Sequence, residues 1–130
     1  KLVKFRRALK IIEDHSLLDG IENIELVGPY GFIDFLNLQY NSFGVISDSG
    51  TSQEECPLLG GPVAVPRNFT ERPESVDNKN SILVGENKAI EKMAVETLDF
   101  FHSYSISEKD IKWLGNGDTA RTISDIIKSS

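Results

Sequence analysis

The sequence predicts an α/β domain in which helices flank a parallel β-sheet. Four short apolar runs carry this prediction, at residues 24–27, 43–47, 62–66 and 81–84. Their starting positions are 19 residues apart, and the segments between them have helical spacing or read as long loops. Strands that alternate with helical patterns are typical of βαβ units, in which the crossovers are right-handed. The second and third runs are apolar at successive positions, so we expect both faces of these strands to be covered.

The helices are predicted from apolar side chains that recur every three or four positions. A further helix is expected to begin shortly after residue 49, and the polar stretch 67–80 is expected to be a loop. Ser107 and Asp118 are expected to be N-caps. The predicted helical ranges are 2–18, 32–40, 90–101, 107–114 and 118–128.

Composition limits the possible partners of the chain. Its 130 residues are 39% hydrophobic and 26% charged, which is typical of one folded domain and excludes disordered and collagen-like classes. The formal net charge of −6 argues against nucleic acid as a partner, because such binding depends on Lys and Arg. The sequence lacks an apolar run of roughly 20 residues, so we expect no membrane span. We also expect neither a metal ion nor a cofactor.

Two residues, Cys56 and Lys1, bear on the cellular compartment of the protein and on the extent of its chain. Cys56 is the only cysteine, which suits a reducing compartment, so we expect a cytoplasmic protein in which Cys56 is a buried structural thiol. The chain begins with Lys1 rather than Met, so we expect it to be part of a longer protein.

The most informative segment is 45–56, where an apolar strand ends, a turn of small residues follows and a helix begins. In parallel α/β sheets, ligands bind beyond the carboxyl ends of the strands. The start of the helix offers unpaired N–H groups and the positive end of a dipole, which suit a phosphate. Gly50 allows close approach of the backbone, and Ser49 and Thr51 add hydroxyl donors. The segment therefore predicts a phosphate site.

The same segment has a second interpretation. The spacings Thr51-x-x-Glu54 and Ser52-x-x-Glu55 both fit a capping box, which serves only to start a helix. Alternatively, the two carboxylates lie one turn into the helix, where they could accept hydrogen bonds from ribose hydroxyls. By spacing alone the capping box is the commoner use of such a turn, and both interpretations stay open.

A second polar segment, 66–74, follows the third strand and so is expected at the same edge of the sheet. Its two arginines, Arg67 and Arg72, could hold an anionic group in a bidentate manner. The alternative is a solvated loop with local Arg–Glu pairs.

Three blocks of sequence together resemble one enzyme family. They are Ser47–Glu55 (SDSGTSQEE), Leu59–Val63 (LGGPV) and Arg67–Glu74 (RNFTERPE). In order and spacing they closely resemble the C-terminal half of UDP-N-acetylglucosamine 2-epimerases. Residues 28–36 and 115–120 are also similar to that family, so the resemblance covers about residues 9–128.

The resemblance implies a fold and an architecture. The family has a two-domain fold like that of the GT-B glycosyltransferases, with the active site in the cleft between two Rossmann-like domains. Residues 1–130 then correspond to a single, partial nucleotide-binding Rossmann-like domain. The N-terminal domain of the family, which supplies most of the acid/base carboxylates, is absent from this sequence, so the catalytic residues stay unknown and the isolated chain is expected to be inactive.

The resemblance also implies roles for individual residues. Ser49, Gly50 and Thr51 would cradle the UDP diphosphate, Glu55 would hold the ribose, and Phe35 would lie against the uracil. The motif residues that would face the cleft are Arg67, Thr70, Glu71 and Arg72.

The implied function is that of an isomerase acting on a UDP-sugar substrate. The family converts UDP-N-acetylglucosamine to UDP-N-acetylmannosamine by eliminating UDP and adding it back. The alternatives are a hydrolysing epimerase that releases free N-acetylmannosamine, the C-terminal domain of a UDP-sugar glycosyltransferase, and a non-catalytic UDP-binding module. We also expect a homo-oligomer as the assembly.

The resemblance leads to one prediction about the sheet. In the usual doubly wound order, two absent strands would lie between residues 24–27 and residues 43–47. We therefore expect these two strands either to pair directly or to associate with another molecule along the exposed edge. The strands at 43–47, 62–66 and 81–84 should be adjacent and parallel.

Overall fold

The computed structural model describes residues 1–129, which form two compact units, Lys1–Phe35 and the chain from Leu36 onward. Each unit contains parallel strands together with helices. The predicted α/β class, a parallel sheet with flanking helices, is confirmed.

The first unit contains a sheet of two short parallel strands. Strand β1 (Leu2–Val3) pairs with β2 (Leu26–Val27), and helix α1 (Arg6–Asp14) lies between them in the chain. The backbone N–H of Leu2 donates to the Glu25 carbonyl at 2.8 Å. Helix α2 (Phe32–Tyr40) begins in this unit and ends in the second.

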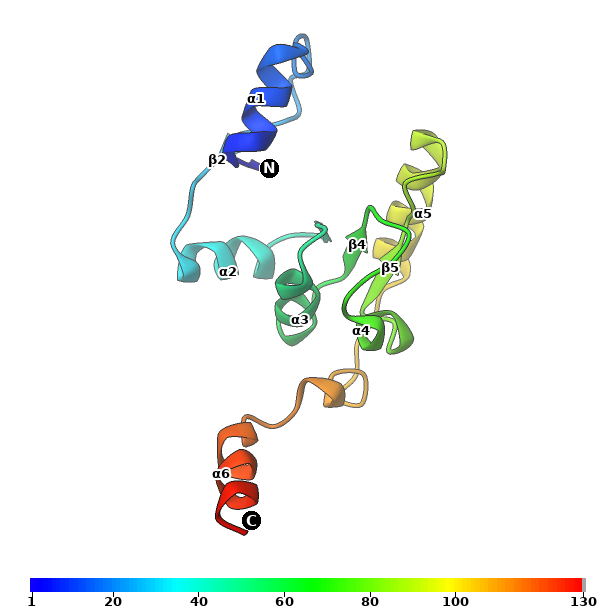
Figure 1. The fold of residues 1–130 in the computed structure, drawn as a ribbon. Helices are drawn as coiled ribbons and strands as arrows, with labels where there is room; N and C mark the ends of the chain where they lie inside the picture. Colours follow the sequence, from blue (N-terminus) through cyan, green and yellow to red (C-terminus); the bar gives the residue numbers. More distant parts are fainter. Residues whose placement is uncertain (130) are drawn as a thin grey trace. The chain divides into compact units, whose positions relative to one another are not determined.

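The second unit contains a three-stranded parallel sheet in the order β3-β4-β5. Strands β4 and β5 run side by side in the same direction (Figure 1). This arrangement confirms the predicted adjacency of the last three strands. The elements of this unit after α2 are β3 (Val45–Ile46), α3 (Gly50–Leu58), β4 (Val63–Val65), α4 (Pro73–Asp77), β5 (Ser81–Leu83), α5 (Ile90–Ser103), the 3₁₀ turn η1 (Lys112–Leu114) and α6 (Thr119–Ser129).

Alternation along β4 divides the core of the second unit into two clusters. Val63 and Val65 pack with Cys56 of α3, whereas Ala64 packs with Val84 and with Phe101 of α5. All three residues of β4 are buried, as expected for the central strand of a parallel sheet. The sheet thereby holds the start of α3 at the carboxyl ends of β3 and β4.

The N-terminal region differs from its prediction in two ways. The helix predicted at 2–18 is longer than the observed one, because only Arg6–Asp14 are helical and Leu2 and Val3 form β1. Direct pairing of 24–27 with 43–47, the first of the two expected alternatives, is wrong, because β2 takes β1 as its partner instead. The second alternative, association with another molecule along the exposed edge, stays a prediction. Apolar residues at helical spacing are also compatible with a two-residue strand at the start of the segment. Only the long-range pairing of that strand with β2 distinguishes the strand from a helix.

Three further predictions need correction. Ile46 of β3 is 65% exposed, so only one face of this strand is covered. The helix predicted at 107–114 is not formed, and this range contains only η1. Ser107 donates both its N–H (2.8 Å) and its hydroxyl (2.6 Å) to the Asp110 carboxylate. The predicted loop 67–80 contains α4, which begins at Pro73, a residue whose fixed φ suits the first turn of a helix.

Between residues 1 and 129, no helix is both long and apolar enough to cross a membrane.

Candidate functional site

Helix α3 begins directly after the turn that ends β3. Ser49 is its N-cap residue and has an extended backbone (φ −77°, ψ 128°), and its N–H donates to the Ser47 hydroxyl at 3.1 Å. Within the described chain, the Ser49 side chain makes no capping hydrogen bond. Because the N–H groups of a first helical turn have no intrahelical acceptor, the exposed start of α3 presents donors and a positive dipole end to solvent.

The predicted capping boxes are not formed. Glu54 makes an ion pair with Arg72, and Glu55 accepts a hydrogen bond from the Gln39 amide at 2.9 Å. Each carboxylate therefore points to a neighbouring element rather than back to the start of its own helix. A charged or amide partner on another element competes successfully with the local cap.

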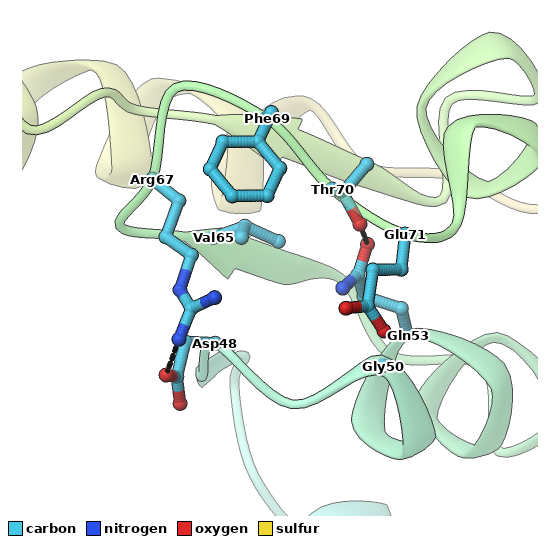
Figure 2. Close-up of a pocket in the computed structure, with 8 residues that line it drawn as sticks. All are labelled: Asp48, Gly50, Gln53, Val65, Arg67, Phe69, Thr70 and Glu71. Atoms are coloured by element: carbon cyan, nitrogen blue, oxygen red, sulfur yellow. Dashed lines mark hydrogen bonds and ion pairs between the residues drawn. The ribbon is translucent and has the colours of Figure 1, made fainter.

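A small pocket opens beside the first turn of α3. Its volume is about 70 Å³, below the roughly 300–1,000 Å³ typical of sites for whole small molecules. Figure 2 shows the side chain of Glu71 pointing from the loop toward α3, and that of Arg67 crossing to Asp48. The pocket can therefore receive one group of a larger ligand. Its lining residues are Asp48, Gly50, Gln53, Val65, Arg67, Phe69, Thr70 and Glu71.

Hydrogen bonds tie the loop after β4 to α3. The Thr70 hydroxyl donates to Oε1 of Gln53 at 2.7 Å, and the Arg72 N–H donates to the Thr70 hydroxyl oxygen at 3.0 Å. Gln53 is only 1% exposed, so its amide oxygen depends on Thr70 for a partner. Thr70 therefore links the loop to the buried side of the helix.

Both arginines of the loop are paired with carboxylates. Arg67 pairs with Asp48 at the end of β3, and Arg72 pairs with Glu54 of α3. The hydrogen bond and the charge of Glu54 raise the pKa of Arg72. These pairs join residues 18 and 19 positions apart, so they are long-range links and not the local Arg–Glu pairs of the solvated-loop alternative.

Another side of α3 makes a buried polar contact with α2. The Cys56 thiol donates to Oε1 of Gln39 at 3.0 Å, and the Gln39 amide nitrogen donates to Glu55. Burial, with a smaller contribution from the Glu55 charge, raises the pKa of Cys56 to about 12. Cys56 is 2% exposed, which confirms the predicted buried thiol.

The structure brings together four of the predicted site residues, Gly50, Arg67, Thr70 and Glu71, at the pocket. Arg72 adjoins them through its contacts with Thr70 and Glu54. The others lie elsewhere: Ser49 and Thr51 are exposed at the start of α3, Glu55 faces Gln39, and Phe35 lies half-buried in α2 within the first unit.

Sequence reasoning missed two polar residues, of which Gln53 lines the pocket and Gln39 contacts the predicted site residue Glu55. Gln53 lies three positions after Gly50, a helical spacing that could have indicated a shared face. Gln39 carried no such signal, because its partners Glu55 and Cys56 lie 16 and 17 residues away in the chain.

The structure of this chain is similar to two solved structures. The M. jannaschii UDP-GlcNAc 2-epimerase in complex with UDP-GlcNAc and UDP is 29% identical with a TM-score of 0.79, over 97% of this chain and 34% of that one. The S. aureus MnaA–UDP structure is 30% identical with a TM-score of 0.75, over 98% of this chain and 35% of that one.

Sequence comparisons agree with the structural ones. A Yersinia pestis UDP-N-acetylglucosamine 2-epimerase is 46% identical over 73 residues, which are 56% of this chain and 19% of the relative. The Campylobacter jejuni enzyme of the same name is 37% identical over 112 residues, which are 85% of this chain and 29% of the relative. The chain thus spans less than a third of the length of these curated relatives. The family model described as UDP-N-acetylglucosamine 2-epimerase matches residues 4–128, and the chain belongs to this family.

Proposed function

We propose that this chain is the UDP-holding portion of an epimerase that interconverts UDP-N-acetylglucosamine and UDP-N-acetylmannosamine. The observation that carries the proposal is the exposed start of α3, with its Ser-Gly-Thr turn beside a pocket at the carboxyl edge of the sheet. Solved relatives of the family hold UDP or UDP-GlcNAc. The same ligand class fits the donors that α3 presents here.

The diphosphate would lie at the first turn of α3. The backbone N–H groups there, with the hydroxyls of Ser49 and Thr51, are suited to phosphate oxygens. Arg67 and Arg72, at and beside the pocket, are paired with Asp48 and Glu54, and each guanidinium has further N–H donors that could face a phosphate. Glu71 is an acceptor and would repel phosphate, so its carboxylate is suited to sugar hydroxyls instead.

The nucleoside would be held by one residue of α3 and one of α2. Glu55 would accept hydrogen bonds from the ribose hydroxyls, and Phe35 would offer an aromatic surface to the uracil. Both roles follow from the family resemblance, and the contact between Gln39 and Glu55 adds support for an oriented carboxylate at position 55.

The reaction requires that UDP be held while it is detached from the sugar. A base removes the C2 proton and the C1–O bond breaks, so that UDP leaves as an anion and a glycal forms. UDP then adds back to C1 while an acid returns a proton to the opposite face of C2. The residues of this chain would bind and neutralise the departing diphosphate, which lowers the barrier to C1–O cleavage.

Conversion in heavy water tests the activity. We expect the protein that carries this chain to convert UDP-N-acetylglucosamine to UDP-N-acetylmannosamine with one deuterium at C2, seen by NMR. Release of free N-acetylmannosamine would instead identify a hydrolysing enzyme. UDP binding without any change of the sugar would refute the epimerase proposal. A polypeptide of these 130 residues alone is predicted to leave the sugar unchanged.

The role of Glu55 is tested by comparing two neighbouring carboxylates. We expect Glu55→Ala to weaken UDP binding by roughly 10- to 100-fold, the loss of a charge-assisted hydrogen bond. The matched control is Glu54→Ala, whose carboxylate faces Arg72. Titration calorimetry with UDP decides, and equal affinities of the two variants would refute the ribose assignment.

We also propose that the protein is cytoplasmic and forms a homo-oligomer. The buried Cys56 thiol suits a reducing compartment. In the part of the chain that the structure describes, the outer edges of β3 and β5 have no strand partner, and such edges favour association. Sedimentation at several protein concentrations tests the assembly, and a monomer throughout would contradict it.

A further inference from the structure

The Gln39 side chain lies between Cys56 and Glu55. Its Nε2 donates to Oε2 of Glu55 at 2.9 Å, and its Oε1 accepts from the Cys56 thiol at 3.0 Å. Gln39 is only 4% exposed, and these two contacts satisfy both polar ends of its amide within the protein. A polar side chain buried between two partners is held in one orientation.

The chemistry of the partners determines which end of the amide faces which side chain. An ionised carboxylate only accepts hydrogen bonds, so the nitrogen of Gln39 must face Glu55. Its oxygen then needs a donor, and the Cys56 thiol supplies one because burial keeps this thiol protonated, with a pKa of about 12. The reversed amide would place its oxygen against the Glu55 carboxylate, which is repulsive.

This arrangement orders Glu55 before any ligand arrives. A free glutamate side chain loses rotamer entropy when a ligand immobilises it, and a partner that already holds the side chain removes much of this cost. Gln39 uses one of the roughly four acceptor positions of the Glu55 carboxylate. Enough acceptor capacity therefore remains for a pair of hydroxyl groups.

We propose that Gln39 is a positioning residue that holds the Glu55 carboxylate in the orientation needed to bind the ribose hydroxyls of a uridine nucleotide. Cys56 supports it by fixing the direction of the Gln39 amide. The inference rests on the proposed function, in which Glu55 binds the ribose. It adds two residues to the site that make no contact with the ligand themselves.

The test compares UDP with 2′,3′-dideoxyuridine 5′-diphosphate, which lacks both ribose hydroxyls. Gln39→Met keeps the length of the side chain and removes the amide. We expect this variant to bind UDP about tenfold more weakly, while its affinity for the dideoxy analogue changes by less than about twofold. Retained binding of the analogue also shows that the variant is folded. An unchanged affinity for UDP, or an equal loss for both ligands, would overturn the proposal.

Glu55→Ala separates failure of this inference from failure of the proposed function. If its loss of affinity is selective for UDP and that of Gln39→Met is not, only the positioning role is wrong. If Glu55→Ala shows no selectivity, the ribose assignment fails and the inference fails with it.

Two further variants complete the design. Cys56→Ser keeps a donor for Gln39 and should bind UDP like the original protein, whereas Cys56→Ala should show part of the selective loss. Asn37→Met removes an exposed amide from the same helix and should leave both affinities unchanged. Equal behaviour of the serine and alanine variants would refute the role of Cys56.

Discussion

On one face of the three-stranded sheet, Val63 and Val65 pack against Cys56 of α3; on the other, Ala64 packs against Phe101 of α5. The α5 face leaves an apolar groove of about 470 Å³ that Phe43 and Ile46 also line. The α3 face instead continues into the small pocket at the carboxyl edge, which polar and apolar side chains line together. Both faces of the sheet are packed, and the candidate site lies on the face where the core holds α3 against β4.

The largest expected effect concerns the α5 face. A Cβ atom added at Gly44 would lie 2.3–2.7 Å from three ring atoms of Phe101, closer than non-bonded atoms allow. We therefore expect Gly44→Ala to lower the free energy of unfolding by about 1–3 kcal/mol, as overpacking commonly does. Chemical denaturation measures this change.

A double variant sharpens this prediction. Gly44→Ala combined with Phe101→Leu removes the ring that the new methyl group meets, so the two changes together should cost less than their sum. Additive losses would show that the close approach of Gly44 to the ring is not what limits this position.

The strands of this sheet were predictable from sequence, whereas several contacts were not. Residues 62–66 are all apolar, and the β-branched Val63 and Val65 lie between two prolines, so the central strand was evident. The strand Leu2–Val3 was not, because it is two residues long and its only signal is its pairing with β2.

Within the site, the Ser-Gly-Thr turn and the arginine loop were correctly expected at one edge of the sheet. The partners of Glu54 and Glu55 were not, since a capping box is a local pattern and the observed contacts join elements 16–18 residues apart. Sequence spacing reports local geometry, and these side chains are oriented by tertiary packing.

Because Cys56 is buried in the core on the α3 face of the sheet, its thiol should be protected from reagents in solution. Because the pKa of Cys56 is raised from 9.0 to about 12, the folded protein should resist a thiol reagent at pH 8 and react only after unfolding. The raised pKa contributes stability that is fully present below about pH 9 and is lost as the pH rises toward 12. Comparison with Cys56→Ser over this range isolates the contribution of the thiol, and rapid reaction of the native protein at pH 8 would contradict the burial.

The smallest effect is expected at the rim of the α3 face. Glu54 and Arg72 are both more than a third exposed, and such ion pairs contribute about 0.2–1 kcal/mol. Glu54→Ala should therefore lower stability slightly, and less at high salt, without weakening UDP binding. A large drop in stability would mean that this pair, rather than the core, holds the loop to α3.

The central claim is that the first turn of α3 binds the diphosphate of UDP, and Gly50→Ala tests it most directly. A Cβ at this position would lie 3.5 Å or more from Arg72, an ordinary contact, so the fold can accept it. Alanine also has the higher helix propensity, by about 1 kcal/mol. We predict an unchanged or raised melting temperature together with UDP binding weakened by about tenfold or more, because the methyl group occupies the space that the phosphate needs. Unchanged UDP affinity in a stably folded Gly50→Ala variant would contradict the account.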